Sequence, residues 1–344
     1  MRVEEFDYYL PPELIAQHPS NKREASKMMV LHRHSNEIEH KNFHNIEDLI
    51  TPDDLIVINN TKVIPARIFG KKETGANIEI FLIHQIEKNI WECLLRPQKR
   101  VKAGINIILK DNSNIKVLDK SANDKWIIKV ADNFEININS VGNMPLPPYI
   151  KREQDNVFES SDRERYQTIY AKIPGAIAAP TAGLHFTPEI IDRLKSNGSK
   201  IAEITLHVGL GTFKPVKTEN IEDHIMHKEL YSITEDTAEL INEYKAERKR
   251  VISVGTTTIR TLESVAQLNN GNIKACSGWS NLFIYPGFDF KITDACITNF
   301  HLPKSTLIML VSALAGKDFI FHAYNEAIIN NYRFYSYGDC MFIS

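Results

Sequence analysis

The sequence is poor in cysteine, and its few cysteines form no pair or cluster. Cys93, Cys276, Cys296 and Cys340 are scattered through 344 residues, and no Cys-x-x-Cys motif occurs. Structural zinc sites and the disulfide frameworks of small secreted domains need cysteines at close spacing. The pattern argues against both, and it predicts reduced thiols in the cytoplasm.

A long hydrophobic run and a strong net charge are also missing. The longest apolar run, residues 307–315, is interrupted by Ser312, whereas a membrane span needs about 20 apolar residues. The first residues lack the apolar stretch of a secretory signal. Lys and Arg number 41 against 43 for Asp and Glu, a net charge of −2. A nucleic acid would therefore have to meet a local basic patch, because bulk charge would not hold it.

The composition is otherwise that of a globular protein, with 43% hydrophobic residues and a length that suits about two domains. Between residues 63 and 141 short alternating runs occur without a helical period. Several short strands in succession predict a small barrel or sandwich. The strands predicted there are residues 77–83, 91–95, 105–109, 115–118, 126–130 and 134–138.

Outside that segment, strands and helices alternate, which predicts an α/β domain with a largely parallel sheet. The predicted strands are residues 28–32, 37–43, 55–58, 200–208, 251–254, 282–285 and 295–298. The predicted helices are residues 11–15, 187–197, 235–248, 257–268, 305–315 and 318–330. Thr187 before Pro188 and the pair Ser232 and Glu235 are typical helix starts.

The clearest local motif follows a predicted strand, where Gly255 precedes Thr256, Thr257 and Thr258. The free N–H groups and the dipole at the first turn of a helix attract anions. Arg260, one turn further on, can bind a phosphate or a carboxylate. A helix that is simply well capped gives the same pattern. Because no Gly-Lys-Ser/Thr ending follows, the segment is not a P-loop.

Other motifs leave two interpretations open. Gly209 and Gly211 follow a predicted strand, where open α/β sheets bind ligands, although a tight turn looks the same. His224 and His227 could share one helix face, but a metal would need a third ligand that the sequence does not identify. Acid–base or hydrogen-bonding histidines are the alternative. The basic residues 96–102 are either a phosphate contact or a solvated face.

Eight longer motifs occur in one order. They are NNTKVIPAR (59–67), PLPPYI (145–150), APTAGLHF (179–186), LHVGLGTF (206–213), HIMHKE (224–229), VGTTTIR (254–260), TNFHLPKST (298–306) and YRFYSYGD (332–339). With these motifs the chain resembles the S-adenosylmethionine:tRNA ribosyltransferase-isomerases, a family of queuosine biosynthesis. The resemblance extends from residue 6 to the C-terminus.

The resemblance implies an α/β domain of residues 1–62 and 146–344, interrupted by an inserted β-barrel domain of residues 63–145. It also implies that the ribosyl group of S-adenosylmethionine is transferred to, and isomerised on, 7-aminomethyl-7-deazaguanine at the tRNA wobble position. The products would be epoxyqueuosine in the tRNA, adenine and methionine. S-adenosylmethionine would be a consumed co-substrate, so no bound cofactor, metal or membrane is expected.

The chemistry of that reaction suggests candidate residues. The sulfonium acidifies the ribose 5′-carbon, and a base that works near neutral pH is most simply a histidine. The candidate catalytic residues are His185, His207, His227, His301, Glu229 and Asp339. The candidates for substrate binding are Thr256, Thr257, Thr258, Arg260, Asn299, Lys304, Ser305, Arg333, Tyr335 and Tyr337. Lys99, Arg100 and Lys102 are the candidates for tRNA binding.

Two positions depart from the family pattern. Asn60 and Asn281 stand where an acid is common in the family. If either acid were the essential base, the chain would be an inert tRNA-binding homologue. A metal-dependent hydrolase built on His224 and His227 is the third interpretation.

Overall fold

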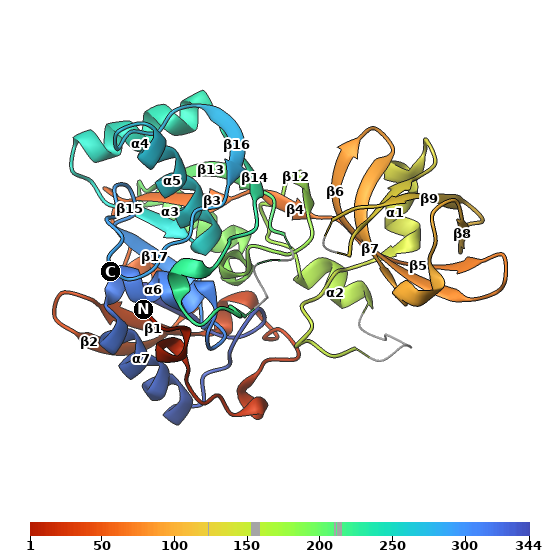
Figure 1. Ribbon diagram of the computed structural model, residues 1–344. Helices are drawn as coiled ribbons and strands as arrows, with labels where there is room; N and C mark the ends of the chain where they lie inside the picture. The colour runs from red at the N-terminus through yellow and green to blue at the C-terminus, as the bar shows by residue number, and fades with distance from the viewer. Residues whose placement is uncertain (123, 153–158, 210, 212–214) are drawn as a thin grey trace.

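The computed structural model describes residues 1–122, 124–152, 159–209, 211 and 215–344. It consists of a large α/β domain and a smaller β-barrel beside it (Figure 1). The chain enters the barrel from the centre of the large domain and returns to that domain afterwards. The α/β class with an inserted barrel is therefore confirmed.

A nine-stranded sheet runs through the large domain in the order β16-β14-β13-β3-β15-β17-β18-β1-β2. Its strands are β1 Lys27–His32, β2 Glu37–Asn42, β3 Leu55–Asn59, β13 Lys200–Leu206, β14 Glu229–Ile233, β15 Val251–Val254, β16 Cys276–Ser280, β17 Ala295–Asn299 and β18 Cys340–Ile343. The four central strands β13, β3, β15 and β17 pair in parallel. Antiparallel pairs at the flanks make the sheet mixed.

Helices cover both faces of this sheet. They are α3 Pro188–Ser196, α4 Glu235–Ala246, α5 Thr256–Leu268, α6 Thr306–Ala315 and α7 Lys317–Ile329. Strand β3 is buried throughout, and its alternate side chains enter two cores. Leu55 and Val57 pack in the core shared with α4 and α5, whereas Ile56 and Ile58 pack in the core shared with α3.

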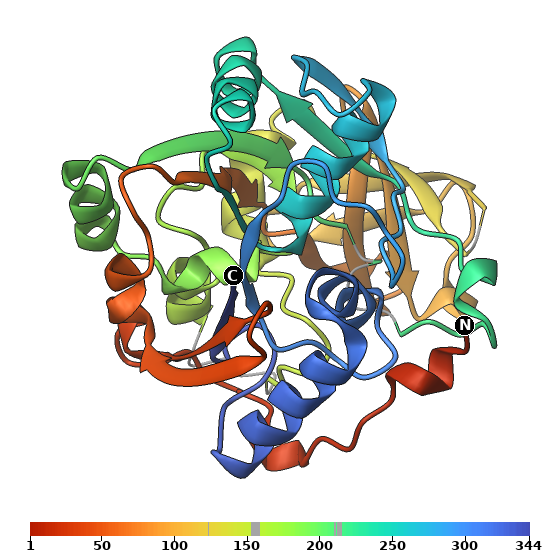
Figure 2. The ribbon, with the colours of Figure 1, turned by 90° about the vertical axis from the view of Figure 1, so that its left-hand side faces the viewer.

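The N-terminal segment completes a further core around α6 and α7. Figure 2 shows these two helices together, with the N-terminal residues beside them. Phe6 lies in the same cluster as Met309 of α6 and Tyr324 of α7. Both ends of the chain therefore help to fix the position of β17 and the residues that follow it.

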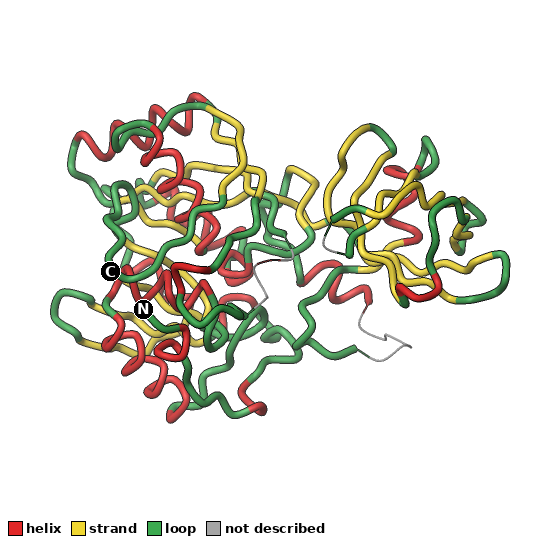
Figure 3. Tube along the Cα trace, in the orientation of Figure 1, coloured by secondary structure: helices red, strands yellow, loops and turns green. Residues whose placement is uncertain are grey.

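Six antiparallel strands form the barrel, which closes because β8 pairs back to β5. They are β5 Arg67–Lys72, β6 Asn77–Glu87, β7 Ile90–Arg96, β8 Asn106–Leu109, β9 Asn114–Lys120 and β10 Trp126–Lys129, and β11 Gly142–Asn143 adds to β5. Ile68, Ile80, Leu95 and Val117 fill the interior. Closure leaves no free sheet edge between these strands. The strands and helices are traced in Figure 3.

The prediction of a strand at residues 134–138 was wrong, because Phe134–Val141 forms helix α1. Phe134, Ile138 and Val141 are spaced at four and three residues, and all three are buried against the barrel. A short run of this kind fits a helical and an extended pattern equally well. Strand β5 was missed, because its alternation is interrupted by glycine and lysine.

Three other predictions need correction. Residues 282–285 form no strand, and the sheet edge is β16 instead. His224 and His227 do not lie on a helix, because the chain is irregular between Ile221–Asp223 and β14. The hydroxyl of Thr234, not Ser232, caps α4 by accepting the N–H of Thr237 at 3.4 Å.

The remaining short elements are α2 Glu159–Arg165, the parallel pair of β4 Thr61–Val63 and β12 Ile173–Ala176, and 3-10 turns at Val3–Phe6, Pro12–Leu14, Arg23–Ala25, Phe43–Asp48, Gln98–Arg100 and Thr181–His185. The predicted helix at residues 11–15 is therefore a single 3-10 turn. The other predicted helices and strands of the large domain are confirmed within a few residues.

A buried carboxylate fixes the segment that leads into β17. Glu263 of α5 has no exposed surface and accepts the N–H groups of Lys291, Ile292 and Thr293 at 2.8–3.1 Å. Burial raises the pKa of Glu263, while the three backbone donors oppose that shift. The carboxylate thus connects α5 to the start of the strand that carries Thr298 and Asn299.

We predict that Glu263→Ala lowers the free energy of unfolding by about 3 kcal/mol or more, because each buried N–H left without a partner costs about 1–3 kcal/mol. Glu263→Gln retains one acceptor oxygen and should cost less. Urea unfolding measured by circular dichroism compares the variants. An alanine variant as stable as the wild type would contradict this role of Glu263.

Candidate functional site

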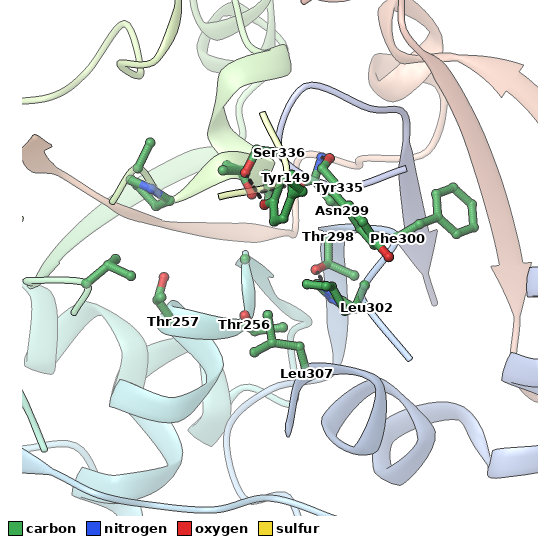
Figure 4. Close-up of a pocket in the computed structure, with 17 residues that line it drawn as sticks. Tyr149, Thr256, Thr257, Thr298, Asn299, Phe300, Leu302, Leu307, Tyr335 and Ser336 are labelled. Atoms are coloured by element: carbon green, nitrogen blue, oxygen red, sulfur yellow. Dashed lines mark hydrogen bonds between the residues drawn. The ribbon is translucent and has the colours of Figure 1, made fainter. Parts of the chain in front are cut away.

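Polar residues collect where the four central strands end. Because β13, β3, β15 and β17 run in parallel, their carboxyl ends meet at one edge of the sheet, where open α/β sheets bind ligands. A small pocket of about 50 Å³ lies at this edge (Figure 4). Its lining includes Tyr149, Thr181, Val208, Gly255, Thr256, Thr257, Thr298, Asn299, His301, Leu307, Tyr335 and Ser336.

Asn59 fixes the geometry behind the pocket. It ends β3, is 1% exposed, and its amide donates to the carbonyl of Leu206 at 3.0 Å and to Oγ1 of Thr257 at 3.3 Å. Its Oδ1 accepts the N–H groups of Leu206 and Thr61 at 3.0 and 3.2 Å. One buried side chain therefore links β3, the end of β13 and the first turn of α5.

Helix α5 presents free donors to the pocket. Gly255 precedes it with a φ of 87°, a conformation that favours glycine, and no side chain caps the helix. Among the described residues nothing accepts a hydrogen bond from the backbone N–H of Thr256 or Thr257. With the positive end of the helix dipole, these groups form an anion-binding position.

Two tyrosines form the opposite side. Figure 4 shows Tyr149, Tyr335 and Ser336 across the pocket from Thr256 and Thr257. The tyrosine rings are 4.7 Å apart, and the hydroxyl of Tyr149 is 2.7 Å from that of Ser336. Burial raises the pKa of both tyrosines, so both remain protonated donors at neutral pH. The pocket therefore combines an aromatic wall with hydroxyl groups.

Two of the candidate histidines are buried around the pocket. Nε2 of His301 is 2.9 Å from Oγ1 of Thr298, and burial lowers the pKa of His301 to about 3. His185 lies behind Asn299, whose Nδ2 is 3.3 Å from Nε2 of His185. Burial, with a smaller contribution from Arg333, also lowers the pKa of His185 to about 3. Both rings are neutral at pH 7 and are weak bases.

A second hollow lies between the large domain and the barrel. We call it the interdomain groove; its lining includes Lys62, His84, Trp91, Gly175, His207, Val208, Lys228, Glu229 and Trp279. Val208 also lines the pocket, so the two spaces meet at this residue. His207 lines the groove next to Val208 in sequence, and its Nδ1 is 2.8 Å from the hydroxyl of Thr61. Burial lowers its pKa below the ordinary histidine value of 6.5.

Glu229 and Arg260 form a buried ion pair near this junction. Glu229 also accepts the N–H of Gly209 at 2.8 Å, and Nε of Arg260 donates to the carbonyl of Leu282 at 3.0 Å. Arg260 is only 4% exposed. Its guanidinium therefore holds the loops beside the pocket in place and does not line it.

Other candidates also lie outside the pocket lining. The hydroxyl of Thr258 donates to the carbonyl of Val254, at the end of β15, at 2.7 Å. Ser305 caps α6 by accepting the N–H of Ile308 at 3.3 Å. Lys304 forms ion pairs with acids of the N-terminal segment at 2.8 and 2.9 Å.

The C-terminal candidates shape the loop that carries Tyr335. Asp339 is 2% exposed and accepts the N–H groups of Arg333 and Lys27 at 2.8 and 3.1 Å. The guanidinium of Arg333 also reaches Asp339 at 3.2 Å. The hydroxyl of Tyr337 donates to Asp162 at 3.1 Å. Of this group, only Tyr335 faces the pocket.

The predicted tRNA-binding residues lie on the barrel surface. Lys99, Arg100 and Lys102 are exposed in the turn between β7 and β8, and they line neither the pocket nor the groove. His227 is exposed with its ring against Gly211. Within the described ranges no group of three His, Cys, Asp or Glu residues could hold a metal. Leu210, Thr212 and Phe213 of the 206–213 motif lie outside those ranges.

The two residues that depart from the family pattern, Asn60 and Asn281, lie in different surroundings. Asn60 points away from the pocket and donates to Glu203 at 3.0 Å, and Thr205 donates to Asn60 at 2.7 Å. An aspartate at this position would face the Glu203 carboxylate, so the amide suits its neighbour. Asn281 is exposed after β16. Neither departure removes an acid from the lining of the pocket.

Sequence reasoning missed Asn59, which lies behind the pocket, and several lining residues. Asn59, Thr181 and Thr298 could have been found, because they stand at or after strand ends in the family motifs. Tyr149 and Ser336 could not, because they come from segments about 190 residues apart and meet only through the fold. Within the described part of the chain, no single helix is long and apolar enough to cross a membrane.

Comparisons with known proteins agree over the whole chain. Residues 3–343 match the family described as "Queuosine biosynthesis protein". The chain is 50% identical over 343 residues to the S-adenosylmethionine:tRNA ribosyltransferase-isomerase of Thermotoga maritima, with both chains fully covered. It is 51% identical over 347 residues to the protein of that name from Desulfitobacterium hafniense, again with full coverage of both.

A solved structure gives the same result. The crystal structure of S-adenosylmethionine tRNA ribosyltransferase from Thermotoga maritima aligns with a TM-score of 0.56 and 39% identity. The alignment covers 99% of this chain and 100% of that one. Family model, curated relatives and structure thus agree from one end of the chain to the other, and the chain belongs to the queuosine biosynthesis protein family.

Proposed function

We propose that this chain is an S-adenosylmethionine:tRNA ribosyltransferase-isomerase that transfers and isomerises the ribosyl group of S-adenosylmethionine on tRNA. The observation that carries this proposal is full-length identity of about half to curated enzymes of that name. The acceptor is 7-aminomethyl-7-deazaguanine at the wobble position, and epoxyqueuosine, adenine and methionine are the products. Because the proposed substrate is tRNA, we expect the protein to be in the cytoplasm.

The pocket at the strand ends suits S-adenosylmethionine. The free N–H groups of Thr256 and Thr257 suit the methionine carboxylate, and the rings of Tyr149 and Tyr335 suit the adenine. No Asp, Glu, Lys or Arg is among its described lining residues. A neutral wall leaves the sulfonium without a counter-ion, which favours loss of a proton from the adjacent carbon.

His207 is the candidate we favour as the base. The reaction needs a group that accepts a proton from the ribose 5′-carbon, and a useful base has a pKa near the working pH. His185 and His301 are too weakly basic, and His227 is exposed outside the pocket. His207 lies where pocket and groove meet, and Thr61 occupies its Nδ1 while Nε2 has no partner among the described residues. The hydroxyl of Thr61 fixes the ring orientation.

The chemistry uses the sulfonium in place of a Lewis acid. Once the 5′-carbon has lost its proton, adenine departs, and the aminomethyl nitrogen of the tRNA base attacks the sugar. Methionine then leaves as the sulfur–carbon bond breaks. The proton is lost and the sulfur–carbon bond breaks at the carbon that the sulfonium activates, while adenine leaves from the ribose 1′-carbon and takes up a proton. None of these steps calls for a Lewis acid or a redox change, so we propose that no metal and no bound cofactor take part.

The test is release of adenine from S-adenosylmethionine, measured by chromatography with and without tRNA bearing the modified wobble base. We expect adenine only with that tRNA, and the same rate after exhaustive chelation. An inert homologue would release none. Loss of activity on chelation with rescue by zinc would favour the hydrolase instead.

The first turn of α5 offers a matched pair of variants. Thr257→Val keeps the side-chain shape but removes a hydroxyl that lines the pocket, and we predict a rise in the KM for S-adenosylmethionine of about 10-fold, equivalent to one hydrogen bond of about 1.4 kcal/mol. Thr258→Val removes a hydroxyl that donates to the carbonyl of Val254 in β15 and does not line the pocket, so it should change KM less than 3-fold. Steady-state kinetics measure the KM for S-adenosylmethionine of both variants. An equal rise in KM in the two variants would contradict the placement of S-adenosylmethionine beside Thr257.

We predict that His207→Gln lowers kcat by about 10²- to 10⁴-fold, the usual contribution of a general base, with little change in the KM for S-adenosylmethionine. His227→Gln should cost less than 10-fold. Because burial lowers the pKa of His207, the wild-type rate should rise with pH through a midpoint below 6.5 and then level off. A pH–rate profile whose acidic limb persists in His207→Gln would exclude this residue as the base.

A further inference from the structure

One tryptophan stands apart from the others. Trp279, on the edge strand β16, is 54% exposed, whereas Trp91 and Trp126 are each 7% exposed inside the barrel. Trp279 lines the interdomain groove, and its ring meets that of His84 on β6 with centroids 6.2 Å apart and planes at 75°. An exposed indole at the edge of a groove, steadied by a ring from the opposite domain, is available for stacking.

The charge of the groove differs from that of the whole chain. Lys62 and Lys228 line it and are exposed, and no carboxylate of the described residues is in ion-pair contact with either. The one acid in the described lining, Glu229, is neutralised by Arg260. A chain with a net charge of −2 therefore has a groove of positive charge, which suits an anionic polymer.

The groove is also large, and it shares one lining residue with the pocket. Its volume is about 700 Å³, against about 50 Å³ for the pocket. Val208 lines both spaces, and His207 stands beside it. A base held in the groove would therefore reach the ribose donor at this point.

We propose that the interdomain groove binds the single-stranded anticodon loop, with a nucleobase stacked on Trp279 and with Lys62 and Lys228 contacting the flanking phosphates. Single-stranded RNA is recognised by this combination of aromatic platforms and cationic grooves. The proposal rests on the proposed function, because tRNA is the substrate there. It places the tRNA, which accepts the ribosyl group, in the groove, and S-adenosylmethionine, which donates that group, in the pocket.

Fluorescence tests the stacking, because Trp279 is the exposed tryptophan, whereas Trp91, which also lines the groove, is 7% exposed. An RNA anticodon stem-loop bearing the modified wobble base should quench the emission of the wild type. The same hairpin with that nucleotide and its two loop neighbours made abasic should quench little, since phosphates alone do not stack. Equal quenching by both hairpins, or none by either, would overturn the stacking role of Trp279.

Separate variants test the stacking on Trp279 and the charge of the two lysines. Trp279→Ala should weaken stem-loop binding by about 5- to 150-fold, the usual loss of one base–aromatic stack, whereas Trp279→Phe should keep most of the affinity. Lys62→Ala with Lys228→Ala should reduce the slope of log affinity against log salt by about 1.4, or 0.7 for each phosphate. Ile329→Ala and Lys110→Ala change exposed residues outside the groove and should have no effect.

The affinity for S-adenosylmethionine, measured by calorimetry, should stay within 3-fold of the wild type in every groove variant, which also shows that the variants are folded. Normal stem-loop affinity and salt slope in the groove variants, with tRNA-dependent adenine release intact in the wild type, would overturn the groove proposal alone. Absence of adenine release from the wild type would instead refute the proposed function.

Discussion

The site depends on the hydrogen bonds of one buried carboxamide, that of Asn59. Its two donors and its acceptor oxygen serve Leu206, Thr257 and Thr61, and none is left for solvent. The bonds to Leu206 extend the β3–β13 ladder past its last backbone pair. The bond to Thr257 fixes the first turn of α5. A carboxylate could not donate to the Leu206 carbonyl or to Thr257, so the amide is required for this arrangement.

Two spaces are positioned by this arrangement. Thr257 belongs to the pocket, while Thr61 orients His207 at the groove, so both sides of the junction are fixed to the end of the same strand. The ionisable groups nearby are held in pairs: Glu229 with Arg260, and Arg333 with Asp339. These pairs support the loops and leave the pocket wall neutral. Of the two spaces, the groove is the one whose described lining includes lysines, Lys62 and Lys228.

Sequence reasoning reached much of the fold because its signals are local. Buried strands, capped helices and the turn at Gly255 can be recognised from neighbouring residues. It failed at Phe134–Val141, where a short run suits two periodicities, and it did not find Tyr149 beside Ser336, which depends on tertiary packing. Thr258 and Arg260 show a further limit. Each is close in sequence to Thr257, but the helix turns their side chains toward other partners.

The central claim is that S-adenosylmethionine occupies the pocket at the carboxyl ends of the parallel strands. A crystal structure of the protein with S-adenosylmethionine bound tests it most directly. The account predicts the methionine carboxylate within hydrogen-bond distance of the N–H groups of Thr256 and Thr257, with the adenine against Tyr335 and the sulfonium toward Val208. Electron density for S-adenosylmethionine in the interdomain groove, with none in the pocket, would contradict it.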